Sequence, residues 1–215
     1  REFEQMEIEH FIAVPEKRSD WEDVFETWKA EFYNWFNLVG IDKELIHELE
    51  VSEEELAHYS ERTVDFEFDF PFGKKELYGL AYRTDFDLKN HYDEAPYRDP
   101  LSGEVSYPHV IEPTWGVDRT MLAILTSAYH EEKSEKGSRI FLKLPPKIAP
   151  YKAAVFPLLK NKPELVEKAR GLFEELLEVM PVAWDVRGNV GKRYYAQDEI
   201  GTPYCITIDF DTLED

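Results

Sequence analysis

Two side chains of opposite charge flank a predicted turn near the middle of the sequence. The apolar pair 110–111 is typical of a strand and leads into Glu112, and Pro113 then removes a backbone donor, so we predict that the strand ends there. Gly116 allows a tight turn, and Arg119 lies in the first turn of a predicted helix. A helix N-terminus that carries an arginine can hold a polyphosphate. Strand–turn–helix units with a glutamate and an arginine are nevertheless common, and most of them are structural.

The helix that follows this turn is predicted to be buried. Its apolar residues Met121, Leu122, Leu125 and Ala128 recur at three- and four-residue steps, which is the spacing of one helix face. The helix should therefore fix the position of Arg119.

A pair of carboxylates lies near the start of the chain. Residues 6–12 alternate as a strand does, which places Glu7 and Glu9 side by side on one face. Neighbouring carboxylates on one strand face repel each other and are usually solvated. Without further context, we interpret this pair as solvated.

The elements that would position these groups are a long helix and an antiparallel sheet. A helix is predicted from Ser19 to Gly40, with a stripe of aromatic residues that we interpret as core packing. Residues 64–70 alternate strictly, 71–73 form a turn, and 76–81 return as a second strand. This pattern predicts an antiparallel hairpin.

Two further segments carry local signals. Ser52 opens a capping box that predicts a short helix through Arg62, and residues 131–137 are expected to form a charged surface link. Arg83 follows the second strand of the hairpin, and an ion pair with Asp85 or Asp87 is its simplest structural role.

A boundary is predicted at residues 144–150, because repeated prolines stop regular structure. The segments after it alternate as strand, helix, strand, helix and strand, which predicts a parallel or mixed sheet with helices against it. The expected fold class is an α+β core with an antiparallel sheet, followed by an α/β domain. The predicted domains are residues 1–143 and 151–215, with residues 144–150 as the linker.

Composition narrows the function classes. The net charge is −20, which argues against a general nucleic-acid binder, because phosphate affinity comes largely from Lys and Arg. Residues 1–136 hold 14 basic and 33 acidic residues, whereas residues 137–195 hold 11 and 6, so any RNA-binding face is expected in the second half. The single cysteine, Cys205, excludes an internal disulfide and is interpreted as a buried core thiol. No long apolar run predicts a membrane span, and we expect a soluble, cytoplasmic protein.

Several motifs resemble those of class II aminoacyl-tRNA synthetases, in particular the homodimeric type of glycyl-tRNA synthetase. The segment IEPTWGVDR (111–119) is similar to the third class II motif, and REFEQMEIEHF (1–11) is similar to the end of the second. AYRTDFDL (81–88) resembles a further segment of that family. LKLPPKIAPYKAAVFPL, GNVGKRYYAQDEIGTPYC and ITIDFDT resemble the anticodon-binding domain shared by the glycyl, threonyl, prolyl and histidyl enzymes. The family's preceding Arg-Asn-Glu and its first motif do not occur in this sequence, and the family's anticodon-binding domain normally continues with another strand and a closing helix. The chain therefore looks truncated at both ends.

The resemblance implies roles for individual residues. ATP would be bound by Arg1, Glu2, Phe3, Glu76, Leu77, Arg83, Gly116, Val117, Asp118 and Arg119. Glycine would be bound by Phe3, Glu4, Gln5, Met6, Glu7, Glu112, Pro113, Thr114, Trp115 and Gly116. Among these, Arg83 would reach the α-phosphate, Arg119 the γ-phosphate or pyrophosphate, and Glu76 would hold Mg²⁺. Tyr78 stands where many relatives carry an acid, which would alter the surroundings of the metal.

The implied function is that of a glycine–tRNA ligase, which activates glycine with ATP and transfers it to tRNA(Gly). On the C-terminal domain, Lys160, Arg187, Lys192 and Arg193 are the candidate tRNA contacts. Glycine, ATP, Mg²⁺, tRNA(Gly) and a second copy of the chain are the expected ligands and partners. The alternative is a non-catalytic, synthetase-like accessory subunit that binds nucleic acid. Because the family's upstream motifs do not occur here, we expect no activity from these residues alone.

Overall fold

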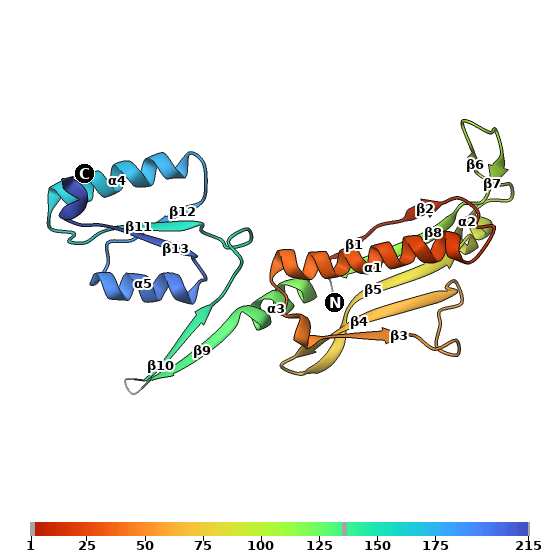
Figure 1. Ribbon diagram of the computed structural model, residues 1–215, viewed down its shortest axis with the longest axis horizontal. Helices are drawn as coiled ribbons and strands as arrows, with labels where there is room; N and C mark the ends of the chain where they lie inside the picture. Colours follow the sequence, from red (N-terminus) through yellow and green to blue (C-terminus); the bar gives the residue numbers. More distant parts are fainter. Residues whose placement is uncertain (1–2, 135–136, 215) are drawn as a thin grey trace. The chain divides into compact units, whose positions relative to one another are not determined.

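The computed structural model describes residues 3–134 and 137–214 of the chain. By internal packing, the chain divides into two compact units. One consists of residues 1–37 and 42–126, and the other of residues 38–41 and 127–215. Each unit contains its own main β-sheet (Figure 1).

The first unit is built on a six-stranded antiparallel sheet with the order β1-β8-β5-β4-β3, in which β2 also pairs with β8. Its strands are β1 (Gln5–Glu7), β2 (His10–Ile12), β3 (Ile46–Glu50), β4 (Arg62–Phe70), β5 (Gly73–Thr84) and β8 (His109–Gly116). The predicted hairpin is confirmed as β4 and β5.

One face of this sheet is covered by the helix α1 (Ser19–Val39), as predicted (Figure 1). The Phe32 ring lies 4.7 Å from that of Phe66 on β4, and Trp21 stacks on Tyr82 of β5 with a centroid distance of 4.1 Å. Such aromatic pairs stabilise a core beyond the apolar area that they bury. The opposite face of the sheet carries the polar side chains described below.

The N-terminal segment forms two short strands rather than the single strand predicted. Between β1 and β2, the Ile8 N–H donates to the Pro113 carbonyl oxygen over 3.2 Å, so the interruption lies opposite Pro113. In a strand, the N–H and C=O of one residue point to the same neighbour, and Pro113 has no N–H to offer there. The prediction that the strand ends at Pro113 is therefore wrong: β8 continues to Gly116, and the missing donor falls at the gap between β1 and β2.

Two irregularities interrupt the pairing of β5 with its neighbours. On the β4 side, Tyr78 pairs with Phe66 but Glu76 pairs with Glu67, so Leu77 is an extra residue. On the β8 side, the register shifts between Tyr82 and Thr84. Thr84 has a φ of 58°, a conformation that a β-branched residue rarely adopts. Bulges of this kind turn side chains away from the regular alternation of a strand.

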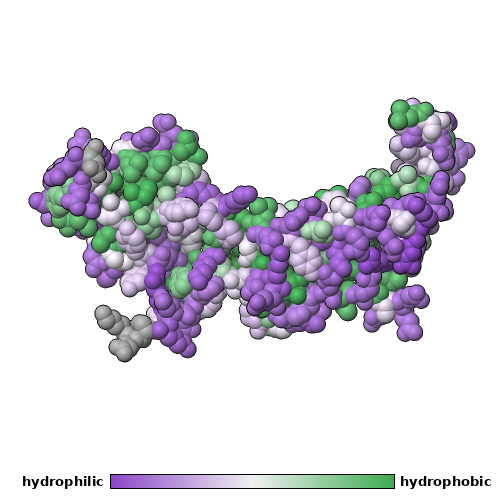
Figure 2. Space-filling model, viewed as in Figure 1, coloured by the Kyte–Doolittle hydropathy of each residue, from purple (hydrophilic) through white to green (hydrophobic). Residues whose placement is uncertain are grey.

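The connections of the first unit differ from the sequence prediction at one point. The Ser52 hydroxyl donates to the Glu55 carboxylate over 3.0 Å, which is a side-chain pair rather than the reciprocal bonds to backbone N–H groups of the predicted capping box. Only a turn follows, and no helix reaches Arg62. The Ser60 hydroxyl bonds the backbone of Arg62 and Tyr82, which holds this segment against the sheet instead. The remaining short elements are η1 (Lys43–Leu45), α2 (Phe86–His91), β6 (Tyr97–Arg98) and β7 (Val105–Ser106). Apolar side chains reach the surface at the tip of the β6–β7 hairpin, where Leu101 is 96% exposed (Figure 2).

Helix α3 (Val117–Ala128) begins directly after β8, at the predicted place. The predicted buried face is largely wrong, because Met121, Leu122 and Leu125 are all exposed. Thr120, Ala123 and Ala128 face the interior instead.

The second unit is an α/β layer with a separate hairpin. The residues predicted as a charged surface link belong largely to that hairpin, β9 (Tyr129–Ser134) paired with β10 (Gly137–Leu142). A parallel sheet in the order β12-β11-β13 follows, with α4 and α5 on its two faces (Figure 1). Its elements are β11 (Ala153–Pro157), α4 (Pro163–Leu177), β12 (Val182–Trp184), α5 (Val190–Glu199), β13 (Tyr204–Ile208) and η2 (Asp211–Leu213).

The predicted strand–helix alternation and the predicted fold class are both confirmed. In the described residues, no helix combines the length and the apolar character needed to cross a bilayer.

Candidate active site

The polar face of the first sheet carries two rows of side chains that run across its strands. In the first row, Glu7 pairs with Thr114, Thr114 with Gly79, and Gly79 with Asp65. Paired residues of antiparallel strands project to the same face, so these four groups are neighbours. Four segments far apart in the sequence thus meet in one line.

The second row runs parallel to the first and is displaced from it by two residues on each strand. Glu112 pairs with Ala81, and Ala81 pairs with Thr63. Small residues therefore occupy the centre of both rows on β5. The two rows line a pocket of about 360 Å³, to which Glu76 and Arg83 also contribute.

Gly79 leaves room in the middle of this pocket. A Cβ atom added there would lie 3.1 Å from the Thr114 hydroxyl oxygen, which is a tight contact. Thr114 in turn donates a hydrogen bond to the Gly79 carbonyl oxygen over 3.3 Å. A glycine inside a strand often marks such a close approach, but the sequence analysis did not use this signal.

Arg83 joins three groups at one end of the pocket. Its Nη1 atom lies 2.6 Å from Glu112 Oε2, and its Nε and Nη2 atoms donate to the two oxygens of Asp87 over 2.8 and 3.1 Å. Its guanidinium also lies 4.1 Å from the centroid of the Tyr59 ring. The Asp87 pair fits one of the expected structural roles, whereas Asp85 pairs with Lys89. The Arg83 hydrogen bonds hold the pKa of Asp87 below its usual range.

Arg119 and Glu76 meet at the other end of the pocket. Arg119 Nη1 donates to the Glu76 backbone oxygen over 2.7 Å and lies 3.6 Å from its carboxylate. Both side chains are about half exposed, so this ion pair is open to solvent. The five residues Glu7, Glu76, Arg83, Glu112 and Arg119 are therefore brought together by the fold.

Asp65 is a further acid of this pocket that the sequence analysis missed. Burial, together with the charges of Glu76 and Glu67, raises its pKa from 3.8 to about 6. The strict alternation of residues 64–70 could have identified it, because it places Asp65 on the face opposite the phenylalanines.

The Glu76 carboxylate is better suited to bind a magnesium ion that arrives with a nucleotide than to form a permanent metal site. Among residues 3–134 and 137–214, no three His, Cys, Asp or Glu side chains are grouped as a metal-ligand set. Mg²⁺ is commonly held by one or two carboxylates together with substrate phosphates. The Glu76 carboxylate is exposed at the pocket and could supply one such ligand.

Other residues of the implied ligand sites lie in different surroundings. Arg1 and Glu2 lie outside the described residues, and Phe3 is 68% exposed. The Glu4 carbonyl oxygen accepts a hydrogen bond from the Val117 N–H, which fixes β1 to the start of α3 next to Gly116 and Asp118. Gln5 lines the pocket.

Four residues of the implied sites point away from the pocket. Leu77 is buried, and Trp115 packs against Phe32 of α1. By their pairing with Trp115 and Leu80, Met6 and Pro113 lie on that same face of the sheet, where Met6 is 45% exposed. Contact of these four residues with a ligand is therefore expected only through the backbone.

Tyr78 also lies on the covered face. Its hydroxyl is bonded to Thr120 and to the Trp35 indole N–H, over 2.8 and 3.0 Å. The Tyr78 side chain therefore points away from the face that carries Glu76, and its effect on a metal there stays a prediction.

In the second unit, three of the four implied RNA contacts are on the surface. Lys160, Arg187 and Lys192 are exposed, and Arg187 is paired with Asp185 over 3.0 Å. Arg193, however, is only 2% exposed, so its assignment as an RNA contact is wrong.

The Arg193 guanidinium instead binds backbone carbonyl groups where two parallel strands end. It donates to the carbonyl oxygens of Pro157, Arg187, Gly188 and Val186 over 2.6 to 3.5 Å. A buried cation is costly unless its donors are satisfied, and these oxygens satisfy them.

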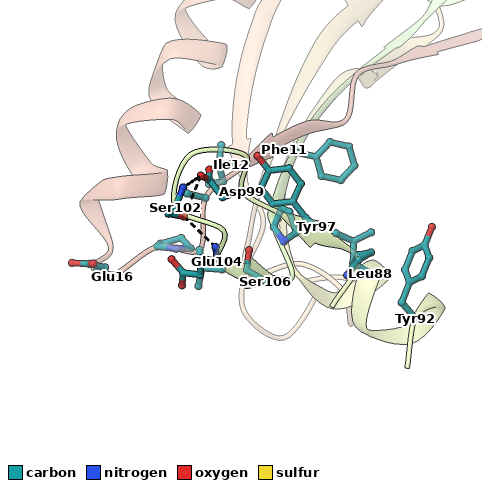
Figure 3. A pocket seen from close by; sticks show the side chains of 15 residues that line it. Phe11, Ile12, Glu16, Leu88, Tyr92, Tyr97, Asp99, Ser102, Glu104 and Ser106 are labelled. Carbon is teal, nitrogen blue, oxygen red and sulfur yellow. Dashed lines mark hydrogen bonds between the residues drawn. The ribbon is translucent and has the colours of Figure 1, made fainter. Parts of the chain in front are cut away.

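A second cavity of about 760 Å³ lies beside the β6–β7 hairpin (Figure 3). Phe11 and Tyr97 line it, and Asp99 accepts hydrogen bonds from the N–H and hydroxyl of Ser102. None of the residues implied by the resemblance lines this cavity, as far as the structure describes them.

Comparison with known proteins agrees with this geometry. The chain matches the anticodon binding domain family over residues 152–215. It is 48% identical to the glycine–tRNA ligases of Alkaliphilus oremlandii and Clostridium acetobutylicum over 220 residues, and 48% identical to that of Bacillus anthracis over 219. Over its whole length, the chain is homologous to the glycine–tRNA ligases. The resemblance to this family that the motifs predicted is thereby confirmed. The chain spans 46% of the length of each of these ligases, or about half.

Proposed function

We propose that this chain forms part of a glycine–tRNA ligase, which activates glycine with ATP and transfers it to tRNA(Gly). Residues 1–143 would belong to the catalytic domain and residues 151–215 to the anticodon-binding domain, joined by a linker at residues 144–150. The protein would act in the cytoplasm, as a homodimer in its complete form.

The observation that carries the proposal is the meeting of acids, guanidiniums and small residues on one sheet face. Glu7 and Glu112 offer negative charge to an ammonium group, and Arg83 and Arg119 offer positive charge to phosphates. The strand residue between them, Gly79, provides space rather than a side chain. The pocket thus presents the two kinds of charge that glycine and ATP require.

Selectivity for glycine would follow from shape. Glycine has no side chain to hold, so a selective site must bind its ammonium and carboxylate groups and exclude larger amino acids by collision. The space that Gly79 leaves is bounded by the Thr114 hydroxyl, which would lie 3.1 Å from an added Cβ atom, so in the proposal a substituent on the bound amino acid would collide with this wall. Exclusion of a larger group by steric collision is effective, so this mechanism needs no editing site.

Activation would proceed by attack of the glycine carboxylate on the α-phosphate of ATP. This step needs little proton transfer, and the contribution of the protein is to position the groups and stabilise charge. In the proposal, Arg83 neutralises the α-phosphate and Arg119 the γ-phosphate or the departing pyrophosphate. A magnesium ion at Glu76 would neutralise charge that develops on the phosphates.

Glycine-dependent exchange of pyrophosphate into ATP tests this proposal. The exchange should be measured on the 215-residue chain and on the same sequence within a chain of the relatives' full length. We expect exchange with glycine, but not with alanine or proline, from the longer chain only. Its loss in Glu112→Gln and Arg119→Ala variants that remain folded would support the assignments. A longer, folded chain that binds tRNA without any exchange would instead support the accessory-subunit alternative.

A further inference from the structure

Glu9 faces Glu112 across the sheet at the edge of the candidate active site. His10 pairs with Ile111, and the Ile8 N–H donates to the Pro113 oxygen, so Glu9 lies opposite Glu112. Opposite positions of antiparallel strands share a face, so the carboxyl groups of Glu9 and Glu112 lie side by side, close enough for one to donate a hydrogen bond to the other. Glu9 lies within the motif of residues 1–11, but the resemblance assigns it no role.

The charges around this pair do not balance. Arg83 approaches Glu112 from β5, but it also holds Asp87 on α2 with its two other donors. Three carboxyl groups, those of Glu9, Glu112 and Asp87, therefore share one guanidinium. The imidazoles of His91 and His58 also lie near enough to lower the pKa of Asp87.

A proton resolves the contact between Glu9 and Glu112. Two ionised carboxylates at hydrogen-bonding distance repel each other, so one of them keeps a proton as the donor of the hydrogen bond. Burial and the neighbouring Glu112 raise the pKa of Glu9 to about 7, while Arg83 opposes this shift.

We propose that Glu9 is a positioning residue, which orients Glu112 and shares one proton with it, so that binding of the glycine ammonium group releases this proton. This inference rests on the proposed glycine–tRNA ligase function. Before binding, Glu9 and Glu112 together carry one proton, and glycine is a zwitterion. After binding, both carboxylates are ionised beside the ammonium group, and the proton has passed to the solvent.

The proposal predicts a proton release that depends on pH. The pair carries a proton below pH 7, so glycine must displace it there, whereas above pH 7 the proton has already left. Binding of glycine should release about 0.9 proton at pH 6, about 0.5 at pH 7 and about 0.1 at pH 8. The Kd for glycine should correspondingly fall about tenfold between pH 6 and pH 8.

The test is calorimetric titration of glycine into the protein saturated with a non-hydrolysable ATP analogue. The sequence should be carried within a chain of the relatives' full length, and two buffers of different protonation enthalpy give the proton count. In Glu9→Gln, whose amide can still donate to Glu112, we expect almost no proton release and a less than twofold change of Kd with pH. Glu54→Gln, which removes an exposed acid outside the pocket, should behave as the unchanged protein does.

Equal proton release by the Glu9→Gln variant and the unchanged protein would overturn the proposal. If Glu9→Gln does not fold, carbon-13 NMR of labelled glutamate in the unchanged protein decides instead. A carboxyl signal that titrates near pH 7, and no longer does so with glycine bound, is the expected result, and its absence refutes the shared proton. Pyrophosphate exchange at pH 8 and saturating glycine separates the two proposals: without exchange the ligase proposal fails, whereas exchange with a pH-independent glycine Kd contradicts only the role of Glu9.

Discussion

The Arg83 Nη1 atom lies 2.6 Å from Glu112 Oε2, although the two residues belong to different strands and are 29 positions apart in the sequence. Neither side chain is more than 17% exposed. In this structure Arg83 is the cation that lies against Glu112, and its other donors hold Asp87. In the proposed reaction, Arg83 and Glu112 would each instead meet a charged part of a substrate.

Loss of this pair should destabilise the first unit. Arg83→Met leaves the Glu112 carboxylate buried without its cation, and we expect a loss of roughly 2 kcal/mol in the free energy of unfolding, less than for a fully buried pair. Urea denaturation of the 215-residue chain measures this loss. Arg98→Met, which removes a guanidinium bonded only to a carbonyl oxygen in the β6–β7 hairpin, is the matched control. Equal denaturation midpoints for the two variants would show that the pair contributes nothing.

A side chain at Gly79 should block the pocket without unfolding the sheet. The added Cβ atom of Gly79→Ala lies 3.1 Å from the Thr114 hydroxyl, so the two must separate by a few tenths of an ångström. We expect pyrophosphate exchange to fall on the order of 10- to 100-fold, because small displacements at a reacting centre are costly. In the double variant Gly79→Ala/Thr114→Ala, part of the exchange should return. An exchange rate unchanged by Gly79→Ala would remove this strand from the proposed site.

Removal of the Asp65 charge should stabilise the protein in alkaline solution. Its pKa is raised from 3.8 to about 6, so its contribution to stability is greatest below pH 3.8 and is lost as the pH rises through 6. Asp65→Asn should therefore raise the Tm at pH 8 by roughly 2–4 °C, a value that allows for solvent screening. The gain should shrink towards zero by pH 4. A gain of the same size at both pH values would mean that the ionisation of Asp65 is not its cause.

Arg193 should matter for stability rather than for direct RNA contact. Arg193→Met leaves four carbonyl oxygens at the ends of β11 and β12 without their donor, and we expect a loss of roughly 3 kcal/mol. Hydrogen exchange of the β11 and β13 amides reports on this unit specifically. In Lys192→Met, which changes an exposed neighbour on α5, protection of these amides should stay the same. Unchanged protection in Arg193→Met would contradict the structural role.

The exposed cations of the second unit should contribute to RNA binding through charge alone. Lys192→Ala and Lys160→Ala should each weaken binding of tRNA(Gly) and lower the slope of log K against log salt by about 1. Filter binding or fluorescence anisotropy at several salt concentrations gives this slope. Asn161→Ala, which changes an exposed neutral residue next to Lys160, provides a control and should leave the slope unchanged. A slope unchanged by both lysine variants would place the RNA elsewhere.

Much of the fold follows from local patterns in the sequence. The aromatic stripe of α1 and the alternation in β4 predict both elements, because burial of one face imposes a strict period on each. The parallel sheet of the second unit also follows from its strand–helix alternation. Patterns of this kind can be recognised in a single sequence because every residue of the element contributes to them.

The differences from prediction arise where a neighbouring strand overrides a local preference. Pro113 remains in β8 because its missing N–H faces the gap between β1 and β2, where no backbone pairing requires it. Ser52 begins only a turn, because Ser60 is already bonded to the sheet. The exposed Met121 face of α3 shows that helical spacing alone does not identify which side is buried.

For the candidate site, motif resemblance identified five charged residues that the fold brings together, but not their partners. The contact between Glu9 and Glu112 depends on the register of β2 against β8, and that of Asp65 with Gly79 on the register of β4 against β5. Strand register is set by long-range pairing, so a single sequence does not reveal it.

The irregular strand β5 has a consequence for the evolution of this protein. Between its two bulges the strand presents Gly79 and Ala81 to the pocket and Tyr78, Leu80 and Tyr82 to the core. Deletion of the extra residue Leu77 would keep this alternation, because Glu76 and Tyr78 already pair with the adjacent residues Glu67 and Phe66. Insertion or deletion of one residue between the two bulges would instead reverse it and turn aromatic rings into the pocket. Homologues can therefore vary in loop length around the sheet and at the bulge itself, whereas an insertion or deletion of one residue between the two bulges of β5 should be eliminated by selection.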